Sequence, residues 1–268
     1  MAEKSEKMTK QELSAPDAFQ LYGAEASDWL MKRSQIISTA VAVLIVGGLI
    51  AALVQYFNNR SEEAAAKQLG QTLETLERPV VEGVALQPAA GELPPFKSEQ
   101  ERDGTAVTEL TKFRADHKGT DAALTAALPL GKAQYRLGKY DEAQATFGEY
   151  TKEAPKGSPL LTSAYEGLGY AHEAKGQLDQ ALEAFKQMGQ TEAGEFMAGM
   201  GQYHQARILV AQGKKDEAAQ LLADLKAAQG TSASGRLATE RLAVLAAQGV
   251  KLPEPKTPPA ATLTPDAG

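Results

Sequence analysis

Apolar residues recur three and four positions apart between Ser163 and Met188, on both sides of a glycine at position 176. This spacing predicts two short amphipathic helices joined by a tight turn. The small residues Gly169 and Ala181 would let the two helices approach closely, and Phe185 would fill the space between them. A helical hairpin of this size cannot bury its apolar face alone, so it needs copies of itself on either side.

The sequence supplies such copies. Three turn glycines, Gly138, Gly176 and Gly213, lie 38 and 37 residues apart, and each one opens the motif Gly-x-x-Asp-x-Ala. We expect the glycine to end the first helix with a left-handed backbone, and the aspartate to cap the second helix by accepting from its free N–H groups. The residues resemble a tetratricopeptide repeat, which implies an α-solenoid of paired helices. The alternative is an ordinary helical bundle whose periodicity is accidental.

A long uncharged stretch precedes the repeats. The 19 residues from Ile36 to Val54 carry no charge, and their length as a helix is close to the thickness of a bilayer core. The aromatic residues Trp29 and Tyr56 flank the stretch, as is typical of membrane interfaces. A signal peptide would be shorter and closer to the N-terminus. We therefore predict a transmembrane helix over residues 36–57.

Basic residues are distributed unequally around this stretch. Five Lys and Arg residues lie on its N-terminal side, against two or three near its C-terminal end. Because positive residues favour the cytoplasmic side, we predict a cytoplasmic N-terminus and repeats on the opposite side of the membrane. In a bacterium, the chain would cross the inner (cytoplasmic) membrane once and place its C-terminal domain in the periplasm.

The remaining segments complete an all-α chain. Residues 1–15 are polar and are predicted to form a disordered cytoplasmic tail. Residues 16–35 form an amphipathic juxtamembrane segment, either a helix at the membrane surface or a helical extension of the span. Residues 58–250 form the tetratricopeptide-repeat-like domain. Residues 251–268 hold five prolines and no apolar period, and we expect a disordered Pro-rich tail.

Proline marks two irregular places within the repeat domain. Residues 79–102 hold four prolines and no helical period, so we expect an inserted loop, after which a helix starts at Asp103. Pro129 lies in the first regular repeat, where the helix either starts near Ala126 or kinks. Residues 232–248 predict one last helix, which caps the stack with a polar face.

Composition narrows the function mainly by exclusion. The formal net charge is −6, so there is no basic field to attract nucleic acid, which we do not expect as a partner. The chain has no cysteine, which removes disulfides and thiolate chemistry; this fits an oxidising compartment, although many cytosolic proteins share it.

Candidate chemistry is sparse. The three histidines fall at different repeat offsets and do not form a shared metal site. His172 occupies a core position of its repeat and is expected to be a packed structural residue. Acid, base and nucleophile do not converge anywhere in the pattern, so we expect neither an enzyme nor a cofactor.

The first helices of the stacked hairpins predict a binding surface, because the concave face of a repeat solenoid is built from them. Tyrosines with charged neighbours suit an extended peptide or a partner helix, since they combine apolar area with hydrogen bonding. The alternative is that these tyrosines only pack between neighbouring repeats. The candidate partner-binding residues are Lys132, Tyr135, Glu166, Tyr170, Tyr203 and Arg207.

The order of segments resembles one known family. A short polar tail, an amphipathic stretch, an uncleaved span, the run from Tyr56 to Arg60 and an immediate repeat helix are similar to the YfgM family of ancillary subunits of the bacterial Sec translocon. The resemblance covers residues from about Ala18 to Gly249. It implies protein partners, namely translocon subunits and a membrane-anchored periplasmic chaperone. The proline-rich insertion and the C-terminal tail depart from the family pattern. The alternative is a scaffold for another envelope complex, in outer-membrane assembly or cell division.

Overall fold

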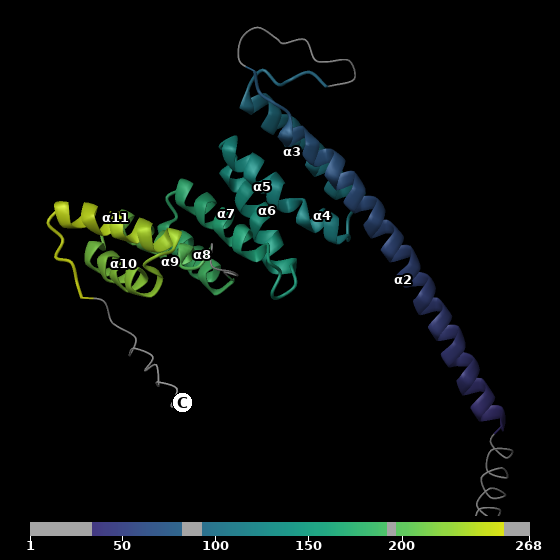
Figure 1. Cartoon of the computed structure of the whole chain (residues 1–268). Coiled ribbons are helices and arrows are strands. Elements are labelled where there is room, and N and C mark those ends of the chain that lie inside the picture. Colours follow the sequence, from purple (N-terminus) through teal and green to yellow (C-terminus); the bar gives the residue numbers. More distant parts are fainter. Residues whose placement is uncertain (1–33, 82–92, 192–196, 255–268) are drawn as a thin grey trace, which may run out of the picture. The chain divides into compact units, whose positions relative to one another are not determined.

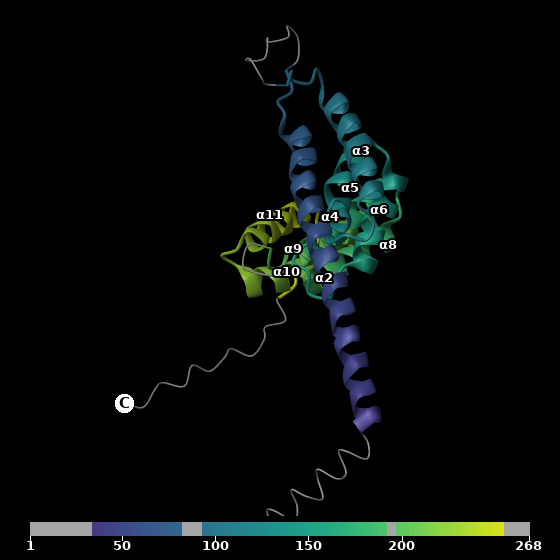
Figure 2. The same cartoon turned by 90° about the vertical axis from the view of Figure 1, so that its right-hand side faces the viewer.

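A computed structural model describes residues 34–81, 93–191 and 197–254 of the chain. Every named element in these residues is an α-helix, so the predicted all-α class is confirmed. From α5 to α11, consecutive helices pack against one another in chain order (Figure 1 and Figure 2). The helices are α2 (Ser34–Glu77), α3 (Glu99–Asp116), α4 (Asp121–Thr125), α5 (Ala127–Arg136), α6 (Tyr140–Glu153), α7 (Leu161–Ala174), α8 (Leu178–Thr191), α9 (Met200–Ala211), α10 (Lys215–Gln229) and α11 (Ala233–Ala247).

Three of the predicted segments lie largely or wholly outside the residues that the structure describes. The tail over residues 1–15 and nearly all of the segment 16–35 lie outside the part that the structure describes. The same holds for most of the Pro-rich tail over residues 251–268. These predictions therefore stay predictions.

Helix α2 belongs to both of the compact units into which the chain divides, residues 1–60 and 61–268. In the first unit its large apolar side chains are exposed, and Val43 and Leu44 are 65% and 75% exposed. Within the described residues, α2 is the helix that is long and apolar enough to cross a membrane. The transmembrane helix predicted over residues 36–57 lies inside α2, and the helix continues without a break into the second unit.

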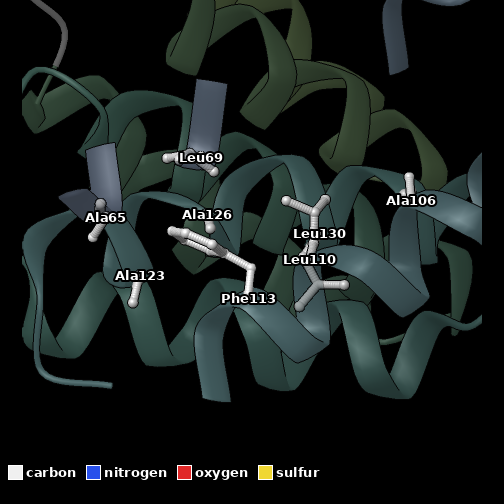
Figure 3. Close-up of a cluster of buried hydrophobic side chains, with 10 residues drawn as sticks. Ala65, Leu69, Ala106, Leu110, Phe113, Ala123, Ala126 and Leu130 are labelled. Carbon is white, nitrogen blue, oxygen red and sulfur yellow. The ribbon is translucent and has the colours of Figure 1, made fainter. Parts of the chain in front are cut away.

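In the second unit, the C-terminal part of α2 pairs with α3. Ala65 of α2 is buried with Leu110 and Phe113 of α3 in one apolar cluster (Figure 3). The hydroxyl of Thr75 donates a hydrogen bond to the carboxylate of Glu109 at 2.6 Å. These two helices form the first pair of the repeat domain.

The helix that was expected to start at Asp103 begins earlier, at Glu99. Its N-cap is Ser98, whose hydroxyl accepts a hydrogen bond from the N–H of Glu101 at 3.1 Å. This bond satisfies one of the free N–H groups of the first turn, which allows the helix to begin there. The predicted loop over residues 79–102 is therefore too long at its C-terminal end.

The two ends of the inserted segment are joined by backbone hydrogen bonds. The N–H of Val81 donates to the carbonyl of Phe96 at 2.9 Å, and the N–H of Phe96 donates to the carbonyl of Pro79 at 3.0 Å. The guanidinium carbon of Arg78 lies 4.0 Å from the centroid of the Phe96 ring. The segment thus leaves α2 and returns to α3 through a short paired neck.

The three turn glycines occupy equivalent bends, as predicted. Their φ angles are 74° at Gly138, 72° at Gly176 and 81° at Gly213, all in the left-handed region that favours glycine. In each turn the N–H of the residue after the glycine donates to a carbonyl five residues earlier, for example from Gln177 to His172 at 2.9 Å. This repeated bond ends the first helix of each pair and starts the second in a constant direction.

The predicted capping by the aspartates is wrong for α6 and α10. The N-caps are Lys139 and Lys214, and neither makes a side-chain capping bond. The turn leads straight into the helix, so Asp141 lies inside the first turn, where its charge still favours the helix dipole. Its carboxylate forms an ion pair with Lys175 in the next repeat. The motif aspartate therefore connects neighbouring repeats.

At Pro129 the structure selects the first of the two alternatives. Helix α4 ends at Thr125 and α5 begins at Ala127, while Ala126 between them keeps helical angles, with φ −61° and ψ −15°. Pro129 consequently lies in the first turn of α5, where its missing N–H leaves no helical bond unmade. The predicted last helix is also present as α11, capped by Ser232.

Aromatic rings fill the space between the two helices of a pair, as the sequence pattern predicted. A Cβ atom added to Gly169 would lie 2.6 Å from the Phe185 ring, and one added to Gly131 would lie 2.8 Å from the Phe147 ring. Both rings are fully buried. The glycines of the first helices thus allow a large ring from the second helix to lie directly on the backbone.

Candidate functional site

A pocket of about 180 Å³ lies between the first helices of two neighbouring repeats, α5 and α7. Four of the six predicted partner-binding residues line it: Lys132 and Tyr135 from α5, and Glu166 and Tyr170 from α7. The side chain of Phe147 from α6 contributes to the lining as well. The remaining lining residues are Arg136, Ser163 and Gly167.

The other two predicted residues do not line this pocket. Arg207 reaches back from α9 to α7: its guanidinium carbon lies 5.4 Å from the centroid of the Tyr170 ring, and it forms an ion pair with Glu173. Tyr203 is half-buried, packs against the cluster around α10 and α11, and contacts the ring of His204 edge-on at 5.6 Å. Arg207 is therefore next to the pocket wall, while Tyr203 packs towards α10 and α11.

The tyrosines also connect successive repeats to one another. The rings of Tyr135 and Tyr170 lie 6.3 Å apart, and Tyr170 meets the ring of Phe185 edge-on at 5.5 Å. Burial raises the pKa of both tyrosines, and nearby ionisable groups, Tyr140 for the first and Glu166 for the second, add to the effect. The hydroxyls therefore stay protonated at neutral pH and remain hydrogen-bond donors.

His204 is a buried residue of this region that the sequence analysis did not single out. It is 4% exposed, stacks on the Phe185 ring at 4.8 Å, and has Nε2 3.4 Å from the Tyr170 hydroxyl. Burial, together with the charge of Arg207, lowers its pKa to about 4. His204 is thus neutral at pH 7, and its 3.8 Å contact with Glu166 is then not an ion pair.

The histidine predicted to be a packed core residue, His172, is less buried than His204. Its Nδ1 lies 2.8 Å from the side-chain amide nitrogen of Gln144 and 2.8 Å from the side-chain oxygen of Gln177. It therefore belongs to a polar contact between neighbouring repeats. Its position in the motif was the only signal available, and that signal did not distinguish it from the residue buried one repeat later.

Glu166 is the acidic residue of the pocket wall. Burial raises the pKa of its carboxyl group, and the charge of Lys132 offsets part of that effect. Among the residues that the structure describes, none donates a hydrogen bond to this carboxylate; its one ion-pair-range contact is the neutral His204. The Glu166 side chain is 28% exposed, so a ligand that displaces water from this carboxylate has to supply a donor in its place.

An ion pair between exposed Arg136 and buried Asp103 holds the opposite wall. Asp103 of α3 is 2% exposed and accepts two hydrogen bonds from Arg136, at 2.6 and 2.8 Å. Burial alone would raise the pKa of Asp103, but the guanidinium groups of Arg136 and Arg102 outweigh it and hold the pKa below its usual value. This bidentate contact fixes Arg136 at the pocket and links α3 to α5.

Two models of the tetratricopeptide repeat match the chain, one over residues 128–193 and the other over residues 201–232. This chain contains tetratricopeptide repeats. Proteins built from tetratricopeptide repeats are generally scaffolds for protein–protein interaction, and the predicted function is confirmed at that coarse level. No curated protein matches the chain.

Solved structures of other proteins are similar to the chain. One is the crystal structure of nearly identical repeats from a Podosopora anserina protein described as a kinesin light chain: it is 21% identical, has a TM-score of 0.48, and the match covers 55% of this chain and 80% of that chain. Another is the Rap conjugation gene regulator of the plasmid pLS20 in complex with the Phr* peptide, 24% identical with a TM-score of 0.37 over 56% of this chain and 48% of that one.

Proposed function

We propose that the chain is a membrane-anchored module that binds other proteins through the first helices of its tetratricopeptide repeats. The pocket between α5 and α7 is the observation that carries this function. It lies on first helices, where repeat solenoids bind their partners, and combines exposed Lys132 with the half-buried rings of Tyr135 and Tyr170. Aromatic and charged groups around a small cavity are typical of the anchor points of protein interfaces.

The anchor is the N-terminal half of α2. Its large apolar side chains from Val43 to Phe57 are all more than half exposed, which is unfavourable in water and favourable in a bilayer. The backbone of the same helix makes its own hydrogen bonds, as a spanning segment requires. Lys32 and Arg33 precede the helix and favour a cytoplasmic N-terminus, with the repeats in the periplasm.

The finer proposal is an ancillary subunit of the bacterial Sec translocon, which links it to a membrane-anchored periplasmic chaperone or to emerging clients. Two features support it: the order of polar tail, apolar span and repeats, and the continuity of α2 from the apolar stretch into the first repeat pair.

Site-specific photocrosslinking in native membranes tests this function. A photoreactive residue would replace Lys132 or Ser163 at the pocket, and Ala145, exposed on α6, would serve as the matched control. We expect translocon subunits or a periplasmic chaperone to be captured from the pocket positions and not from Ala145. Capture of outer-membrane assembly or division proteins would assign the module to that complex, and no capture above the control would contradict the binding face.

Topology is tested independently, because the chain has no native cysteine. Single variants Ser5→Cys and Ala145→Cys would be exposed to a membrane-impermeant maleimide in spheroplasts. We expect labelling of Ala145→Cys in intact spheroplasts and of Ser5→Cys only after lysis. The reverse order of labelling would place the repeats in the cytoplasm.

A further inference from the structure

Neighbouring repeats carry residues of very different size at equivalent positions of the first helix. Gly167 of α7 corresponds to His204 of α9, 37 residues later, which is the spacing of their turn glycines. Four residues earlier, Ser163 corresponds in the same way to Met200. The first repeat of each comparison thus has a small residue where the next repeat has a large one.

The large residues close the gap between α7 and α9. The imidazole of His204 stacks on Phe185 with 29° between the ring planes, and Tyr170 meets its edge at 5.3 Å. Met200 packs against the same buried cluster. The protein therefore fills this gap with a ring of its own, which lies on the phenylalanine of the second helix.

The small residues leave the corresponding gap between α5 and α7 open. Phe147, the counterpart of Phe185, lies directly against Gly167, where an added Cβ would be 2.4 Å from its ring, and both residues line the pocket. The volume of about 180 Å³ is smaller than a typical site for a drug-sized ligand. It is large enough for one aromatic ring, since an apolar cavity of about 150 Å³ binds benzene.

Polar groups around the pocket indicate which kind of aromatic side chain a ligand would place there and which residue would lie beside it. The Glu166 carboxylate in the wall accepts no hydrogen bond from the described residues, so a ring with an N–H or O–H donor fits better than a purely apolar one. Lys132 is exposed at the pocket and has no ion-pair partner in the part of the chain that the structure describes. Its charge favours an acidic residue beside the ring.

We infer that the pocket between α5 and α7 binds a tyrosine or tryptophan side chain of a partner protein, presented in a segment with an acidic residue next to it. The ring enters the pocket between the first helices, beside Tyr135 and Tyr170, whereas the imidazole of His204 closes the next gap. Its hydroxyl or indole N–H donates to Glu166, and the acidic neighbour pairs with Lys132. This inference rests on the proposed function and specifies the feature of the partner that is recognised.

The test uses the full chain in phosphatidylcholine nanodiscs and a defined probe, the peptide acetyl-Gly-Asp-Trp-Asp-Gly-amide with 5-fluorotryptophan. We expect a saturable change of the fluorine resonance. The unlabelled tryptophan or tyrosine peptide should displace the probe, and the leucine analogue should compete at least about tenfold more weakly, because it buries less apolar area and lacks the donor. Equal competition by the leucine peptide would overturn the inference.

Filling the pocket provides the structural control. Gly167→His copies the next repeat but forces Phe147 to move and could unfold α7, so Ser163→Met, which copies Met200, is the primary variant. We expect Ser163→Met to weaken probe binding about tenfold or more with unchanged helicity, while Ala145→Met on the exposed face of α6 leaves it unchanged. Binding that survives Ser163→Met would place the ring elsewhere and overturn the inference.

Charge exchange tests the acidic neighbour. Lys132→Glu should lower the affinity for the probe peptide several-fold. A peptide with lysines in place of its aspartates should bind this variant with the affinity restored. No saturable binding of any probe would also overturn the inference. In that case, specific crosslinks at Lys132 would leave the proposed function standing, so the two failures are distinguishable.

Discussion

Two gaps between first helices are built on the same repeat and end in opposite states. Between α7 and α9, the His204 ring lies on Phe185 and closes the gap. Between α5 and α7, the small residues Ser163 and Gly167 line a pocket. The same pair of helices and the same supporting phenylalanine can therefore end in a closed contact or in a pocket, depending on the side chains of the next first helix.

The two gaps also differ in how their charges are compensated. Arg207, which faces the filled gap, pairs with Glu173 and lies over the Tyr170 ring. Lys132 is two repeats earlier at the same register position and has no ion pair among the described residues. The filled gap is therefore a satisfied internal contact, and the open gap retains a charge that can attract a partner.

The largest expected effect comes from removing the phenylalanine beneath each gap. Phe185→Ala should lower the free energy of unfolding by about 5 kcal/mol, because His204 and Tyr170 lose the ring they contact. Phe147→Ala should cost about 3 kcal/mol, because this ring already borders a cavity. Urea unfolding of both variants, followed by circular dichroism, measures the difference. An equal loss would mean that the two gaps are equally packed.

The next largest effect is a pH dependence of the free energy of unfolding, which arises from His204 in the filled gap. The pKa of His204 is lowered from 6.5 to about 4 in the folded chain, so its contribution to stability is complete above pH 6.5 and is lost as the pH falls towards 4. The expected loss between pH 7.5 and pH 4 is about 3 kcal/mol. Urea unfolding across this range should show a shallower dependence for His204→Phe, which keeps a ring and removes the titration.

Other ionisable groups lie near the His204 ring, so their contribution to the pH dependence has to be separated from that of His204. Burial raises the pKa of Glu166, so this group becomes relatively more favourable in the folded state as the pH falls, which opposes His204. Arg207 and Tyr170 keep their charge states over this range. The comparison is therefore the difference between wild type and His204→Phe. Parallel curves for the two would show that His204 does not control the dependence.

Sequence periodicity was sufficient for the repeats because their signals are local. Each turn requires a residue with positive φ, so the glycines alone were enough to predict the bends at Gly138, Gly176 and Gly213. Helical spacing likewise places Lys132 and Tyr135 on one helix face, and both residues line the pocket. What was read correctly depends on residues within one turn of each other.

The parts that sequence reasoning missed depend on distant residues. Asp103 was read as a helix start, although it is buried by a pairing with Arg136, which lies 33 residues away. The pocket is lined by residues of three helices, α5, α6 and α7, which the apolar pattern of one helix does not bring together. One missed feature did have a local signal: Ser98 and Glu101 have the spacing of a capping box, which marks the start of α3.

A moderate effect is expected from opening the filled gap. His204→Gly should cost about 2 kcal/mol, from the lost burial of the ring and the flexibility of glycine in a helix. It should also create a second cavity over Phe185. Added 4-methylimidazole, which replaces the missing side chain, should restore part of the stability at pH 8.5. His204→Phe is the matched control, and equal stabilisation of both variants would contradict a cavity at this position.

The smallest expected effect on stability is at the open gap, where the change should act on binding instead. Lys132→Glu alters an exposed side chain that has no ion pair in the described part of the chain, although its charge acts on Glu166, so the free energy of unfolding should fall by less than about 1 kcal/mol. Arg207→Glu, its counterpart two repeats later, should cost more, because Glu173 would lose its partner and face a like charge. Urea unfolding of the two charge reversals measures this contrast. A comparable loss for both would show that Lys132 supports the fold and is not held free for a partner.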